Sequence, residues 1–121
     1  MRRLLQALAL PSAIFCFPLQ ALAATTLTPA EIQATFETGK PFSSSTPSGT
    51  SYTIVLNSDG SASRTPRRSK VAITGRWRLS KEGYCSTWGK SQENCYRMEK
   101  DPGRYKVLDR SGSTVAYWTI K

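Results

Sequence analysis

The chain has 121 residues, which suits a single domain, and its 17 basic against 8 acidic residues give a formal net charge of +9 that favours anionic partners. It contains no histidine, which excludes the Ser–His and Cys–His pairs of nucleophilic catalysis. Two thiolates without histidine do not make a tetrahedral zinc site. We therefore expect no catalytic residues, no enzyme activity, no metal site and no cofactor.

Residues 1–23 have the layout of a secretory signal peptide. Arg2 and Arg3 form a positive start, residues 4–22 are almost wholly apolar, and residues 21–23 offer a small-x-small cleavage site. A membrane anchor is the alternative, but two prolines and a glutamine interrupt the apolar run. We therefore expect cleavage, export to the periplasm or the exterior, and no stable membrane span afterwards.

Cleavage would remove 23 of the 121 residues and leave a single β domain, residues 24–121, of 98 residues. Arg2 and Arg3 would leave with the signal, so the mature chain would contain 15 basic and 8 acidic residues. Of the three cysteines, Cys85 and Cys95 would remain, and an even pair in an exported chain predicts a disulfide. The alternative of two free thiols is disfavoured in an oxidising compartment.

A helix is predicted over residues 28–38. The residues that mark its start are Thr28 as N-cap, Pro29 at the first helical position and Glu31 in a capping box. Ile32 and Phe36 lie one turn apart and form its apolar face. Gly39 ends the helix, and a Ser-, Pro- and Gly-rich connector is predicted over residues 40–50.

From residue 51 onward the sequence alternates with period two, which predicts β-strands over residues 51–120. The clearest strand is 70–79, whose predicted inward face holds Val71, Ile73, Gly75, Trp77 and Leu79. Turn signals roughly every 8–12 residues separate about seven short strands. The spacing predicts a mainly β domain with one N-terminal helix, in which a small antiparallel meander forms a barrel or a sandwich.

The turn after this strand sets a register for the next ones. Pairing of Leu79 with Tyr84 places the following aromatic residues on the same inward face. The returning strand then brings Cys95 opposite Cys85. Cysteines at directly opposed positions can reach the short separation that a disulfide requires. In this register Tyr84 faces Tyr96.

Several motifs together resemble a family of small secreted bacterial proteins of unknown function. They are Asp59-Gly60, Thr74-Gly75-Arg76-Trp77, Tyr84-Cys85 and Asn94-Cys95-Tyr96, together with the capped helix and the signal peptide. The resemblance covers residues 27–118 and implies no established activity. The Gly-x-Trp strand is also similar to that of lipocalins and avidins, which implies a barrel that binds a ligand inside.

An aromatic set and a basic set are the candidate binding residues. The aromatic set is Trp77, Tyr84, Trp88 and Tyr96, which either fill the core or line a barrel pocket. The basic set is Arg64, Arg67, Arg68, Lys70, Arg76 and Arg78. We expect these cations on the wet outer face, either as a solvated surface or as a contact patch.

The leading hypothesis is a non-catalytic exported binding module of the periplasm or envelope. Its basic face would contact an anionic envelope component or an acidic protein. Nucleic acid is not expected, because export separates the chain from it and because base stacking needs aromatic residues on the basic face, whereas the tryptophan of strand 70–79 is on the opposite face. The alternatives are a small-ligand carrier with the aromatic pocket, or an inhibitor of a secreted hydrolase that uses loop 40–50 or 89–92.

Overall fold

A computed structural model of the protein describes residues 25–120. The predicted signal peptide and its cleavage site therefore lie outside the described residues. Within the range 25–120, no helix is both long enough and apolar enough to cross a membrane.

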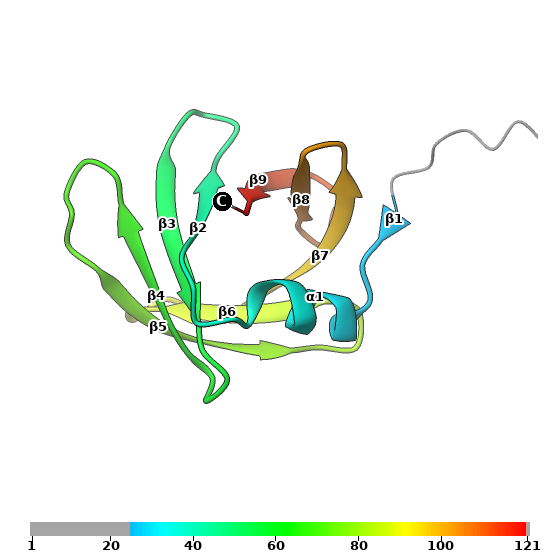
Figure 1. The fold of residues 1–121 in the computed structure, drawn as a ribbon, viewed down its shortest axis with the longest axis horizontal. Coiled ribbons are helices and arrows are strands. Elements are labelled where there is room, and N and C mark those ends of the chain that lie inside the picture. The colour runs from blue at the N-terminus through cyan, green and yellow to red at the C-terminus, as the bar shows by residue number, and fades with distance from the viewer. Residues whose placement is uncertain (1–24, 121) are drawn as a thin grey trace, which may run out of the picture.

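The sheet closes into an antiparallel barrel of eight strands, β2 to β9, each paired with its neighbours in chain order (Figure 1). The pairing of β2 with β9 completes the ring, so the barrel prediction is confirmed and the sandwich alternative is wrong. A ninth strand, β1 (Thr25–Thr26), adds to an edge of β7. The barrel strands are β2 Phe42–Ser45, β3 Ser51–Leu56, β4 Ser61–Pro66, β5 Ile73–Leu79, β6 Tyr84–Trp88, β7 Asn94–Asp101, β8 Arg104–Leu108 and β9 Thr114–Thr119.

Strand β2 lies inside the segment 40–50, so the prediction of a plain connector is wrong for residues 42–45. The chain alternates there as in any half-buried strand: Phe42 and Ser44 are buried, at 3% and 5% exposure. Three consecutive serines hide that alternation, because no apolar residue marks the second inward position. Its partners on both sides, β3 and β9, hold the segment extended.

Strand β5 begins at Ile73, three residues later than predicted. Lys70 has a φ of +57°, a left-handed conformation that turns the chain after β4. Val71 is 69% exposed, so its predicted inward position is wrong. The alternation does hold further on, where Trp77 is buried and Arg76 and Arg78 are exposed.

Helix α1 (Pro29–Phe36) covers one end of the barrel (Figure 1). The predicted capping box is confirmed: the Glu31 backbone N–H donates to Thr28 Oγ1 at 3.2 Å, and the Thr28 N–H donates to Glu31 Oε1 at 3.1 Å. The helix ends two residues before the predicted position 38. Ile32 and Phe36 on its inner face are fully buried, and packing of this face fixes the short helix on the barrel.

The disulfide prediction is confirmed. Cys85 on β6 lies directly opposite Cys95 on β7, and the two sulfurs are bonded. The bond joins the two strands where their pairing spans only residues 84–86 and 94–96. It therefore covalently secures the shortest run of pairing between consecutive strands from β2 to β9.

Replacing both cysteines with alanine should lower the free energy of unfolding by roughly 2.5–3 kcal/mol, since the bond closes a loop with a sequence separation of 10. Urea denaturation followed by tryptophan fluorescence measures this. The oxidised protein treated with a reductant should show the same loss as the double variant. An unchanged midpoint in both samples would mean that the bond does not stabilise the native barrel.

Candidate functional site

The barrel interior has a filled end and a hollow end. Beneath the helix, aromatic rings fill the space: the Phe36 ring lies 4.9 Å from that of Trp118 and 5.0 Å from that of Tyr105. Beyond this layer, away from the helix, lies a cavity of about 150 Å³. Its apolar walls include Ile54, Leu56, Val107, Val115, Ala116 and Trp118. Its polar lining includes Arg64, Ser44, Ser86, Tyr84 and Tyr96.

Arg64 points into this cavity, so the prediction that it joins the outer basic face is wrong. The physical reason is the register: Arg64 lies opposite Ile54 on β3 and opposite Ile73 on β5. Directly paired residues share one face of a sheet, and Ile54 is a buried core residue. Arg64 is thus a cation on the inner wall of the barrel.

The Arg64 guanidinium lies between two aromatic rings. Its central carbon is 5.3 Å from the centroid of Tyr52 and 4.9 Å from that of Trp88, which are cation–π distances. Its Nε is buried and has no hydrogen-bond partner. Of residues 25–120, no carboxylate lines the cavity and none forms an ion pair with Arg64. An arginine stays protonated, so the cavity holds a positive charge without a counter-ion from the described chain.

Two tyrosines face each other across β6 and β7 beside this charge. The rings of Tyr84 and Tyr96 are 5.3 Å apart. Burial raises the pKa of Tyr84 well above its ordinary value, and the neighbouring Tyr96 adds to this rise. Burial also raises the pKa of Tyr96, while Arg64 opposes that rise. Both hydroxyls therefore stay protonated at neutral pH and can donate hydrogen bonds to an anion.

Three of the four predicted pocket residues line the cavity, namely Tyr84, Trp88 and Tyr96. Trp77 is not among the lining residues. It belongs to the packed core, and its indole N–H donates to the Asn57 carbonyl oxygen at 2.9 Å. Trp77 is therefore a structural residue that ties β5 to the β3–β4 turn.

The structure separates the predicted basic set. Arg67, Arg68 and Lys70 remain together on the exposed loop between β4 and β5. Arg76 is exposed, and its Nη2 donates to the Asp59 carbonyl oxygen at 3.4 Å. Arg78 is paired with Glu93 at 2.7 Å, which lowers the pKa of that carboxyl and leaves Arg78 partly neutralised.

Cys85, Glu93 and Cys95 form a cluster whose potential ligand atoms lie within 4.8 Å of one another. The two sulfurs are bonded to each other, and Glu93 pairs with Arg78. A disulfide sulfur is not a thiolate, so this cluster offers none of the soft ligands that zinc takes.

Sequence reasoning missed Arg64 as an inner residue, and it missed Tyr52, Ser44 and Ser86 as further lining residues of the cavity. The signal that could have found them is the hairpin at residues 57–60. Pairing Leu56 with Ala62 across that turn places Arg64 opposite Ile54. Side chains alternate between the two faces of β3, and Ile54 is on the inner face. Arg64, directly opposite Ile54, is therefore also on the inner face.

Fold and cavity together define a small closed β-barrel with a helix over one end and a cationic cavity toward the other. Comparisons of the chain with protein-family models, with curated proteins and with solved structures give no match.

Proposed function

We propose that the protein is a non-catalytic, exported binding protein that holds a small organic anion inside its barrel. The observation that carries this proposal is the buried Arg64 Nε without a partner. This observation favours the small-ligand carrier, which the sequence analysis gave as an alternative. It gives less support to the leading hypothesis, in which the whole basic face contacts a partner. The disulfide is compatible with an oxidising compartment.

The energetics of Arg64 favour a ligand that is negatively charged. A buried donor left without a partner costs about 1–3 kcal/mol, and more when it belongs to a charged group. The cation–π contacts with the rings of Tyr52 and Trp88 offset only part of this cost, about 0.5–2 kcal/mol. A carboxylate is the natural complement, because the guanidinium can bind its two oxygens through parallel hydrogen bonds.

The size of the cavity restricts the ligand. A cavity of about 150 Å³ is comparable to an engineered one that holds a benzene molecule. The apolar walls fit a flat or branched hydrocarbon body, and the same lining carries tyrosine and serine hydroxyls. The ligand class is therefore a monocarboxylate with one ring or a short branched chain.

The test is isothermal titration calorimetry with a panel of single-ring and short-chain carboxylates, each beside its neutral amide. We expect at least one acid to bind, with its amide at least about tenfold weaker, because only the acid pairs with Arg64. Arg64→Met should weaken binding of that acid by at least about tenfold. Arg67→Met is the matched control and should leave binding unchanged, since Arg67 lies outside the cavity.

Native mass spectrometry of protein purified from its own cells adds a direct readout. A bound mass that is present in the wild type and absent from Arg64→Met supports the proposal. Equal affinity for acid and amide would overturn it. So would dissociation constants above about 1 mM for every member of the panel, together with no bound mass.

A further inference from the structure

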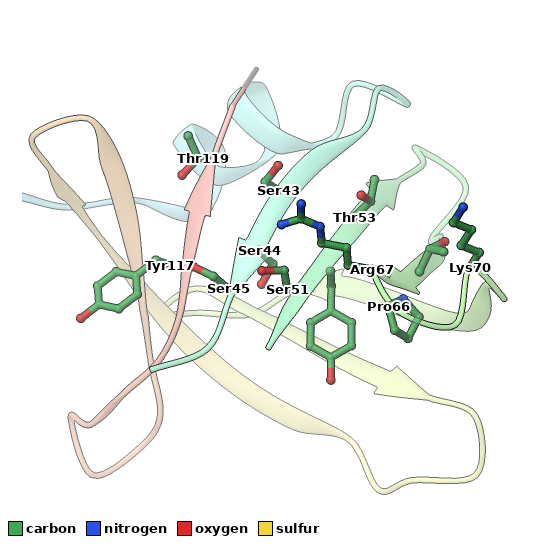
Figure 2. A pocket seen from close by; sticks show the side chains of 12 residues that line it. Ser43, Ser44, Ser45, Ser51, Thr53, Pro66, Arg67, Lys70, Tyr117 and Thr119 are labelled. Carbon is green, nitrogen blue, oxygen red and sulfur yellow. The ribbon is translucent and has the colours of Figure 1, made fainter. Parts of the chain in front are cut away.

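A second recess lies on the outside of the barrel wall and shares only Ser44 and Tyr52 with the lining of the cavity. It measures about 520 Å³ and crosses strands β9, β2, β3 and β4. We call it the outer groove and define it by Ser43, Ser45, Ser51, Thr53, Arg67 and Lys70 (Figure 2). Figure 2 shows Arg67 reaching from the end of β4 toward the hydroxyl groups of β2 and β3.

The strand register arranges the groove hydroxyls in cross-strand rows. In the first row, Ser43 lies opposite Thr119 on one side and opposite Thr53 on the other, and Thr53 lies opposite Thr65. In the second row, Ser45 lies between Tyr117 and Ser51. Neighbouring strands are about 4.8 Å apart, so each row presents hydroxyl groups at that regular spacing. Such rows can exchange hydrogen bonds with a polyhydroxylated chain.

Cations flank both ends of these rows. Arg67 and Lys70 line the groove beside β4, and an adjoining recess shares Arg67 and adds Arg68. At the other end, the Arg104 guanidinium lies 3.8 Å from the centroid of the Tyr117 ring. Across the described part of the chain, no carboxylate lines the groove or the adjoining recess. Arg104 is paired with Asp101 at 3.5 Å, so the groove combines hydroxyl groups with uncompensated positive charge at its β4 end.

We propose that the outer groove binds an acidic polysaccharide with repeating carboxylates. Hydroxyl rows fit the sugar hydroxyls, and Arg67 and Lys70 at the β4 end fit the carboxylates. The lining carries no apolar side chains for insertion into a membrane apart from tyrosine rings and Pro66. Arg104 covers one face of Tyr117, which leaves this ring poorly suited to stacking between nucleobases. This inference does not rest on the cavity: Ser44 and Tyr52 border both recesses, but none of the residues that define the groove lines the cavity.

The first test measures binding of polygalacturonate oligomers to the full chain by fluorescence anisotropy. Arg67→Glu combined with Lys70→Glu should weaken binding by about tenfold or more and reduce its salt dependence. The matched control is Lys81→Glu combined with Lys90→Glu, two exposed lysines outside the groove that change the net charge equally. Equal loss in both double variants would overturn the proposal, because it would show attraction to net charge alone.

The second test removes hydroxyls without changing the charge. Thr53→Val combined with Thr65→Val keeps β-branched side chains on the strands and should weaken polygalacturonate binding by about tenfold. Phosphatidylglycerol vesicles and single-stranded DNA, at matched charge concentration, serve as competitors and should not displace the oligomer. Unchanged affinity of the valine variant, or displacement by vesicles or DNA, would overturn the assignment to a polysaccharide.

The two proposals fail separately. Loss of carboxylate binding in Arg64→Met with intact polygalacturonate binding would place the two ligands at different sites. Loss of both in Arg64→Met would contradict the independence of the groove.

Discussion

Replacing Phe36 with alanine should lower the free energy of unfolding by about 3–5 kcal/mol, the largest effect we expect from a single substitution. Phe36 is fully buried at the interface between α1 and the barrel. Its ring lies within 5.0 Å of the rings of Phe42, Tyr105 and Trp118. The loss is a large share of the roughly 5–15 kcal/mol that stabilises a small domain.

Urea denaturation monitored by tryptophan fluorescence and by far-ultraviolet circular dichroism measures this loss. Phe36→Leu is the matched control, which keeps most of the apolar volume and should cost less than about 1.5 kcal/mol. A loss below about 1 kcal/mol for Phe36→Ala would mean that the helix does not unfold together with the barrel.

Replacing Arg64 with methionine should raise the free energy of unfolding of the ligand-free protein by roughly 1 kcal/mol, because it relieves a cost of about 1–3 kcal/mol and loses cation–π contacts of about 0.5–2 kcal/mol. The substitution removes a buried donor without a partner and keeps a flexible side chain of similar reach between Tyr52 and Trp88. Binding sites commonly trade stability for function in this way. Arg67→Met, on the exposed loop, should change stability by no more than about 0.5 kcal/mol.

Thermal unfolding with and without a bound carboxylate separates the two roles of Arg64. At a ligand concentration 100 times the wild-type Kd, the wild type should gain about 2.7 kcal/mol, while Arg64→Met, with binding at least about tenfold weaker, should gain no more than about 1.4 kcal/mol. A variant that is destabilised by more than about 1 kcal/mol without ligand would contradict this account. The contacts with Tyr52 and Trp88 would then make Arg64 a structural residue.

Local patterns predicted much of the fold. The capping box needs only residues 28–31, and the facing pair Cys85 and Cys95 needs only one hairpin register. The strand around Trp77 was also predictable, because its apolar and charged residues alternate cleanly. In each case the decisive interactions lie within a short stretch of sequence.

The remaining features depend on long-range pairing. The serines of β2 have no apolar alternation, so only pairing with β9 makes them a strand. Arg64 looks like a surface residue by type, and only its register with Ile54 and Ile73 places it inside. The indole N–H of Trp77 donates to the carbonyl oxygen of Asn57, which is 20 residues away in sequence and lies beside Trp77 only in the folded barrel.

The seam between β2 and β9 joins Ser43 to Thr119, 76 positions further along the chain. Contacts between such distant segments form slowly during folding, since a long loop must close first. The last strand supplies Trp118 to the cavity and Tyr117 to the groove. Neither the cavity nor the outer groove is complete until that strand docks, so we expect a partly assembled barrel to bind neither of the two proposed ligands.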